Sequence, residues 1–175
     1  PSETGPLDAA WRAGLADALE SHAEAFAHLR VAAAKGSARF RFDFKRWEED
    51  QSIMEHLGPL RDATRLLQRD AVFKSDGGDM AGAAASVADA FRVADMARLE
   101  PTLISQMART ACLAIALSGM EFTLNRGALT REQLVLIMEA LPQEAVSEGY
   151  ARGHAGECCL TRRKGFKIWD TRPGD

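Results

Sequence analysis

Hydrophobic residues recur along most of the chain at steps of three and four positions, the spacing that gathers them on one face of an α-helix. The first stripe runs from Leu7 through Leu15 to Leu29 and predicts a single amphipathic helix of about eight turns. Lys35 and Gly36 follow it, a cation and a glycine that are typical of a helix end.

A different pattern interrupts the helical spacing over residues 39–47. Aromatic and charged residues alternate there, which places Phe40, Phe42 and Phe44 on one side of an extended chain. Because a lone strand has no neighbour for a ladder, we interpret the segment as an extended connector that pins aromatic side chains against helices. Its interleaved basic residues also resemble a stacking platform for single-stranded nucleic acid or an anionic ligand. Neighbouring acidic residues cancel that charge and favour the connector.

Helical spacing returns after the connector and predicts two helices joined by a tight turn. Pro59 is placed as the first residue of the earlier helix. Residues 75–79 supply the turn, with Asp79 as the N-cap of the next helix. That helix begins with small residues over 81–85, which allow a neighbouring helix axis to approach closely.

A long apolar helix is predicted from Pro101 to Asn125. Its central stretch, residues 111–117, is apolar on all sides, so we expect this helix to be the buried centre of the domain. Three polar residues lie on it: Ser105, Gln106 and Arg109. Buried polar groups need partners, so these side chains either bond to neighbouring helices or line a groove and recognise a ligand or partner.

Two further signals mark the last third of the chain. Thr130 and Gln133 have the spacing of a capping box and predict a helix start. Gly149, Gly153 and Gly156 leave two interpretations open, a close-packing strip on a helix or the place where a helix breaks down.

These patterns, together with 31 alanines, predict an all-α fold. Short Gly/Asp turns favour antiparallel helical hairpins, stacked as an irregular bundle or a short α-solenoid, with one extended aromatic connector at 39–47. The turn at 75–79 resembles that of tetratricopeptide hairpins, although their repeat of about 34 residues is not reproduced. We expect one helical domain over residues 1–160, followed at 161–175 by a basic tail or a truncated continuation.

Composition narrows the classes of function. With 46% hydrophobic and 27% charged residues, the chain resembles a globular protein. Its net charge of -3 lacks the basic excess with which proteins neutralise phosphates, so we expect no nucleic-acid partner. No uninterrupted apolar run approaches the length of a membrane span, so we predict no transmembrane segment within these residues.

The segment from Arg39 to Leu141 resembles a group of uncharacterised helical proteins common in planctomycete-type bacteria. The matching stretches are 39–44, 55–61, the turn at 78–79, residues 100–109, which are the most specific, and 129–134. Proteins of that group look like extracytoplasmic helical domains with an N-terminal membrane anchor. The resemblance therefore implies an anchor upstream of Pro1 and a location on the extracytoplasmic or periplasmic face of a membrane. It implies no catalytic activity.

The best chemical candidate is a thiol cluster near the end of the chain. His154 and Cys158 are four residues apart, so on a helix the imidazole and the thiol share a face. His154 and Arg162 would favour the reactive thiolate, whereas Cys159 would point elsewhere. The simpler interpretation is a pair of surface thiols near a frayed end. The histidines do not form ligand spacings with one another, so we predict no resident metal or cofactor.

Two hypotheses of function follow. The preferred one is a non-catalytic binding or scaffolding domain of a larger or membrane-anchored protein, which holds a protein or peptide partner in a groove between helices. The alternative is a small thiol-dependent redox enzyme or metal-binding protein that uses His154 with Cys158 or Cys159. The basic residues after position 160 predict a solvated tail or a contact with an acidic partner or membrane surface.

Overall fold

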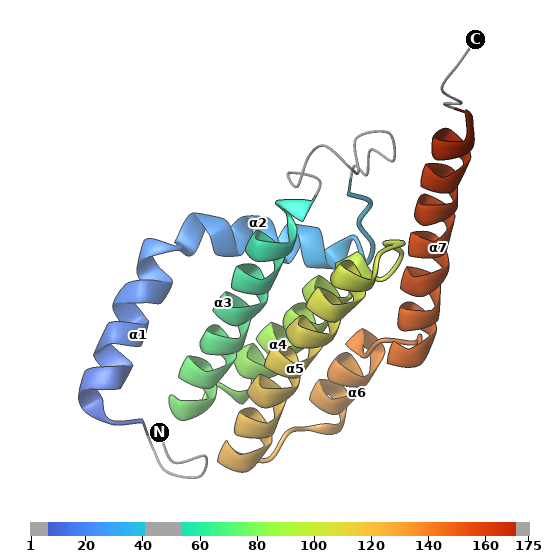
Figure 1. Ribbon diagram of the computed structural model, residues 1–175. Coiled ribbons are helices and arrows are strands. Elements are labelled where there is room, and N and C mark those ends of the chain that lie inside the picture. Colours follow the sequence, from blue (N-terminus) through green and yellow to red (C-terminus); the bar gives the residue numbers. More distant parts are fainter. Residues whose placement is uncertain (1–6, 41–53, 171–175) are drawn as a thin grey trace.

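The computed structural model describes residues 7–40 and 54–170, and all regular secondary structure in this part of the chain is helical (Figure 1). The predicted all-α fold is therefore confirmed. The helices are α1 (Ala9–Ser21), α2 (Ala23–Ala34), α3 (Leu57–Asp76), α4 (Met80–Ala94), the 3-10 turn η2 (Asp95–Ala97), α5 (Leu103–Arg126), α6 (Arg131–Ala140) and α7 (Val146–Asp170).

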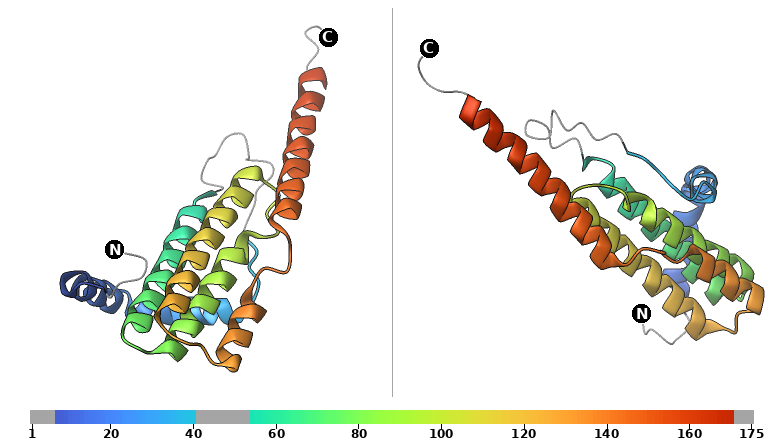
Figure 2. Two further views of the ribbon diagram at one scale, coloured as in Figure 1. Left: turned by 90° about the horizontal axis from the view of Figure 1, so that it is seen from below. Right: turned by 90° about the vertical axis from the view of Figure 1, so that its right-hand side faces the viewer.

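Three helices form the centre of the bundle. Helices α3, α4 and α5 pack against one another in an up-and-down arrangement (Figures 1 and 2). Helix α6 packs on α4, α7 packs on α5, and α2 crosses α4. Helix α1 lies against α3 at the edge of the molecule. The result is a bundle of antiparallel hairpins, as the short turns predict.

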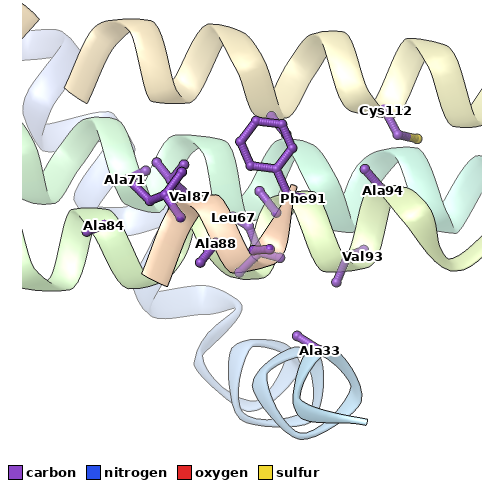
Figure 3. Packing of buried hydrophobic residues seen from close by; sticks show 14 of the residues in the cluster. Ala33, Leu67, Ala71, Ala84, Val87, Ala88, Phe91, Val93, Ala94 and Cys112 are labelled. Carbon is purple, nitrogen blue, oxygen red and sulfur yellow. The ribbon is translucent and has the colours of Figure 1, made fainter. Parts of the chain in front are cut away.

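Small residues dominate the core, which lies where α3 and α4 meet (Figure 3). Leu67 and Ala71 of α3 are fully buried against α4. On α4 the buried alanines alternate with larger side chains, Val87 and Phe91 among them. The alanine-rich part of α4 is therefore packed directly against α3, where alanine adds little side-chain bulk.

Local capping signals determine several helix ends. Gly78 has a φ of +83° in the turn between α3 and α4, and the Asp79 carboxylate accepts a hydrogen bond from the Gly82 amide at 2.9 Å. At the start of α6, the Thr130 hydroxyl accepts from the Gln133 amide, and the Gln133 side chain accepts from the Thr130 amide. The predicted turn, N-cap and capping box are all confirmed.

The N-terminal region differs from its prediction, because two helices replace the single one expected. The break is at His22, whose φ of -111° and ψ of 17° leave the helical region. The hydroxyl of Ser21 and Nδ1 of His22 lie 2.9 and 2.7 Å from the Ala18 carbonyl oxygen. The His22 amide bonds to the Leu19 carbonyl instead. These side chains occupy a carbonyl that a continuous helix would use, and they therefore favour a break at this point.

Helix α5 is central, but it is not buried on all sides. Met107 is 58% exposed and Leu117 is 44% exposed, so the expectation of a fully buried stretch is wrong for one face. Among the described residues, α5 is also the one helix long and apolar enough to cross a membrane. The central helix of a bundle passes the same test, and α5 packs against α3, α4 and α7 with Gln106 and Arg109 buried. We therefore treat α5 as a bundle helix.

Helix α7 resolves the ambiguity of the three glycines. It is continuous from Val146 to Asp170, and its C-terminal half extends beyond the bundle (Figures 1 and 2). The glycines therefore form a strip on a helix, and residues 161–170 continue that helix.

Most of the predicted connector, residues 41–47, lies outside the described residues. Phe40 stacks on His56 with ring centroids 4.2 Å apart.

Candidate binding groove

Helix α1 is attached to the bundle by a small hydrophobic cluster of its own. Leu7 and Leu15 are buried against Val72 of α3, separately from the main core. Phe122 of α5 packs against the same cluster. The remainder of α1 stands away from the bundle (Figure 2), so the helix forms a wall beside α3 and α5.

Asp76, at the C-terminal end of α3, ties this wall in place. Its carboxylate accepts a hydrogen bond from the Leu7 amide at 3.0 Å and pairs with Arg12 of α1 and Arg126 of α5. The hydrogen bond from the Leu7 amide is the largest cause that lowers the pKa of Asp76, and the two guanidinium groups act in the same direction. Arg12 also lies over the Phe73 ring, 4.8 Å from its centroid. One carboxylate therefore links α1, α3 and α5.

A groove of about 830 Å³ lies between α1, α3 and α5. Half of its lining side chains are apolar, and the rest are polar or charged. Trp11 stands on the α1 side and is 48% exposed. The groove is lined by Leu7, Trp11, Leu15, Val72, Ile115 and Phe122, together with Arg65, Gln68, Arg69, Ser118, Glu121 and Asn125.

Contact between α3 and α5 forms one side of the groove. The Gln68 amide donates a hydrogen bond to the Ser118 hydroxyl at 3.3 Å. Gly119 lets the two helices approach, because a Cβ at this position would lie 3.0 Å from Cγ of Gln68. The two helices are therefore fixed against each other here.

The charges of the groove are few and mostly positive. Arg65 and Arg69 come from α3, and Glu121 comes from α5. Arg65 lies 3.7 Å from Asp62, but both side chains are exposed, so the pair is weak. The lining residues combine apolar side chains with two guanidinium groups, one carboxylate and a few uncharged polar groups.

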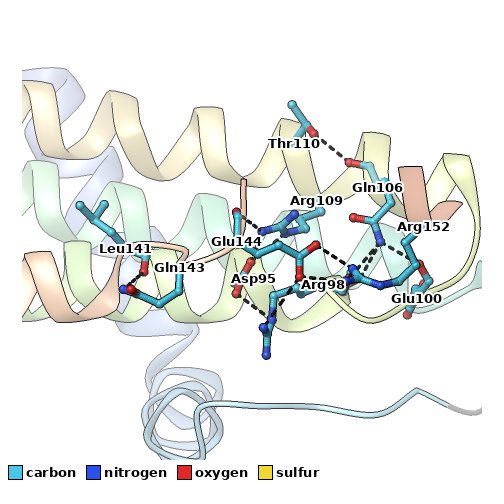
Figure 4. A network of polar contacts seen from close by, with 11 residues as sticks. Asp95, Arg98, Glu100, Gln106, Arg109, Thr110, Leu141, Gln143, Glu144 and Arg152 are labelled. Atoms are coloured by element: carbon cyan, nitrogen blue, oxygen red, sulfur yellow. Dashed lines mark hydrogen bonds and ion pairs between the residues drawn. The ribbon is translucent and has the colours of Figure 1, made fainter. Parts of the chain in front are cut away.

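The three polar residues predicted on α5 lie elsewhere and are buried, and Figure 4 shows Gln106 and Arg109 in a network of polar contacts. Ser105 accepts a hydrogen bond from the Thr102 hydroxyl at 2.7 Å. The Gln106 amide donates to the carbonyl oxygen of Glu100 at 2.7 Å. Arg109, which is 1% exposed, donates to the Asp95 carboxylate at 2.7 Å. Gln106 and Arg109 thus bond to the segment before α5, Ser105 bonds to the N-cap of its own helix, and none of the three lines the groove.

The same network reaches α7. Arg152 donates to both carboxylate oxygens of Glu144, at 2.7 and 3.0 Å, and to the Arg98 carbonyl (Figure 4). These bonds hold the pKa of Glu144 below its usual value. Burial raises the pKa of Asp95, and the ion pair with Arg109 offsets part of that effect. The network joins η2, α5 and α7.

The predicted thiol cluster is on the exposed side of α7. Sγ of Cys158 lies 3.8 Å from Nε2 of His154, so the two side chains share a helix face as expected. Cys159 is exposed, whereas Cys112 is buried in the core. A shallow pocket surrounds the cluster and also includes Glu157 and Arg162. Within the described part of the chain, no group of three or more potential ligands could hold a metal ion.

Sequence reasoning missed the groove. Trp11, Ile115 and Phe122 fit the hydrophobic stripes of predicted helices, and a continuous N-terminal helix gives no reason to expect a separate wall. The sequence feature that indicates a helix break is the pair Ser21 and His22, whose side chains can bond to a backbone carbonyl of the helix.

Comparison with protein-family models, with curated proteins and with solved structures gave no match. The assignment of the groove therefore rests on its own geometry and chemistry.

Proposed function

We propose that this protein is a non-catalytic helical binding domain that holds a protein or peptide partner in the groove between α1, α3 and α5. The observation that carries the proposal is the groove itself, which is about 830 Å³ in volume and has apolar side chains, a half-exposed tryptophan among them, over half of its lining. Exposed tryptophans beside concave apolar surfaces are typical centres of binding energy.

We propose an amphipathic helix with acidic residues beside its apolar face as the partner. A partly apolar groove between helices suits a helix, which presents apolar residues at steps of three and four. Trp11, Ile115 and Phe122 would contact that face. Arg65 and Arg69 outnumber Glu121 in the groove, so acidic residues on the partner would meet complementary charge.

The test uses a fluorescent helical peptide of about four turns, with leucines on one face and glutamates beside them. Fluorescence anisotropy should report saturable binding to the full chain, and Trp11→Ala should weaken it at least about tenfold, since such anchors contribute about 2 kcal/mol. Met138→Ser is the matched control, because Met138 is 63% exposed on α6, away from the groove. Equal effects of the two variants, or no binding, would overturn the assignment.

The charge of the partner is tested separately. The double variant Arg65→Gln, Arg69→Gln should bind the glutamate peptide more weakly. Its binding of a matched peptide, in which glutamines replace the glutamates, should be almost unchanged. Binding of the glutamate peptide should also weaken as salt rises. If both peptides bind alike to the native protein, the preference for acidic partners is wrong.

We also propose that this domain belongs to a larger, membrane-anchored bacterial protein with an extracytoplasmic location. This part of the proposal is supported by the sequence resemblance over Arg39 to Leu141. Fractionation of cells that express the complete gene would test it, because an anchored protein sediments with membranes and is reached by protease added to spheroplasts.

A further inference from the structure

A cysteine and a histidine on α7 form a site that the groove does not use. Sγ of Cys158 and Nε2 of His154 are 3.8 Å apart, within reach of a hydrogen bond to sulfur. Both side chains are exposed, so a small molecule can approach them. They line an open pocket of about 630 Å³ together with Glu157, Cys159 and Arg162.

The charged neighbours of Cys158 differ in what they can do. The Glu157 carboxylate accepts a hydrogen bond from the Leu103 amide at 3.0 Å, so it is engaged at the first turn of α5. Arg162 lies one turn after Cys158 and is exposed. The guanidinium is therefore the charge that a reagent in this pocket can pair with most readily.

We propose that Cys158 is a thiol-exchange site that takes a small, carboxylate-bearing disulfide, with His154 as the proton acceptor and Arg162 as the group that attracts the carboxylate. Nε2 of His154 takes the thiol proton, and Sγ of Cys158 attacks one sulfur of the disulfide. The disulfide S–S bond breaks as the new S–S bond forms. The departing sulfur leaves with the electron pair and takes the proton from the imidazolium. Cys158 is oxidised to a mixed disulfide and the reagent is reduced to one thiol.

Cys159 provides the internal comparison. It is exposed on the same helix, but the residue one turn before it is Ala155, which has no proton acceptor. Adjacent cysteines cannot readily bond to each other without distorting the helix, so we expect the mixed disulfide on Cys158 to persist.

The experiment measures the rate of mixed-disulfide formation with oxidised glutathione at neutral pH by mass spectrometry. Full-length Cys159→Ser, which retains Cys158, is compared with Cys158→Ser, which retains Cys159. The first should react at least about tenfold faster, because a positioned base accelerates proton transfer. Adding His154→Gln to the Cys159→Ser variant should reduce the rate at Cys158 to that of Cys159. Adding His28→Gln, at an exposed histidine on α2, should not change the rate at Cys158. Cys112 must stay unmodified, which shows that each variant is folded.

The class of reagent is tested with cystamine, a small disulfide that carries amines. It should react more slowly than oxidised glutathione with Cys158, and Arg162→Gln should remove that difference. Equal rates for Cys158 and Cys159, or a His154→Gln variant as fast as its parent, would overturn the site. A faster reaction with cystamine would overturn the assignment of an anionic disulfide.

Discussion

The backbone of Gly153 in α7 lies against the carbonyl group of Thr102, the residue that caps α5, so that a Cβ at Gly153 would stand 2.9 Å from this oxygen. Gly149 and Gly156 are on the same side of α7, and side chains there would meet Gln106 and Pro101. The three glycines therefore allow the backbone of α7 to approach the first turns of α5 more closely than any other residue would.

Replacing Gly153 by alanine should destabilise the protein. Alanine favours a helix by about 1 kcal/mol over glycine, but here its methyl group meets backbone atoms, and overpacking costs about 1 to 3 kcal/mol. Because these contacts are with backbone atoms that cannot easily move, we expect the upper part of that cost, and the free energy of unfolding in urea should fall by a net amount of about 1 to 2 kcal/mol. Gly14→Ala is the control, because a Cβ at Gly14 in α1 meets open space. That variant should be unchanged or slightly more stable, and a similar loss in both would contradict close packing of α7.

Arg109 is the polar side chain whose loss should cost most. Arg109→Met removes the closer donor of the Asp95 carboxylate and the donor of the Glu144 carbonyl, and leaves Arg98, 3.5 Å from Asp95, as the remaining partner of that carboxylate. Breaking a buried pair in this way costs about 3 to 5 kcal/mol, which urea unfolding will measure. A second substitution, Asp95→Asn, should recover part of the loss, because it removes a half-buried charge whose remaining partner is the more distant Arg98. Asp62→Ala breaks an exposed pair and should change stability by about 1 kcal/mol or less.

The sequence predicts the parts of the fold that depend on neighbouring residues. Asp79 and the Thr130 and Gln133 pair cap their helices through bonds that span three residues, so their spacing is sufficient evidence. The partner of Arg109 is Asp95, and its carbonyl contact is Glu144, 35 positions away. Spacing alone cannot decide whether such a residue is paired or lines a groove.

The groove was missed for a related reason. Its wall exists because α1 ends at Ser21, and its position depends on the distant contact between Leu7 and Asp76. A stripe of leucines predicts that its own segment is helical, but it does not show which other helix will pack against those leucines.

Stability should depend on the protonation of Asp76 in acid. Its folded pKa is lowered from an ordinary value of 3.8, first by the Leu7 amide, so the ionised form is stabilised in the folded protein. That stability is present above about pH 4 and is lost as the pH falls through the lower folded pKa. Asp76→Asn should therefore be less stable by about 2 kcal/mol at pH 7, the contribution of hydrogen bonds to a charged group. The difference from the native protein should shrink when unfolding is measured at pH 3, and a constant difference would contradict this linkage.

The three cysteines should fall into two classes. Burial raises the pKa of the Cys112 thiol, and the side chain has no access to solvent, whereas Cys158 and Cys159 are exposed. An aromatic disulfide reagent should therefore label Cys158 and Cys159 in the folded protein and label Cys112 only in denaturant. Labelling of Cys112 in buffer would show that the contact between α3 and α5 opens readily.

The bend between α1 and α2 should survive the loss of the side chains that interrupt the helix. Replacing Ser21 and His22 by alanine removes their bonds to Ala18 and favours a straight helix by about 1 to 2 kcal/mol. Burial of Leu7 and Leu15 against α3 opposes straightening, at about 1.5 to 3 kcal/mol for each leucine. The packing is the larger effect, so the double variant should stay bent.

Spin labels on exposed Ala10 and Val31 measure the bend, in a protein whose Cys158 and Cys159 are replaced by serine. A straight helix would place these positions about 32 Å apart, and a bent one brings them closer. The distance should remain short in the double alanine variant and lengthen toward about 32 Å when Leu15→Ala is added, because the anchor on α3 is then weakened. Peptide binding should be lost in the same step. If the double variant alone straightens, the cluster around Leu15 does not hold α1, and the wall of the groove depends on the helix break instead.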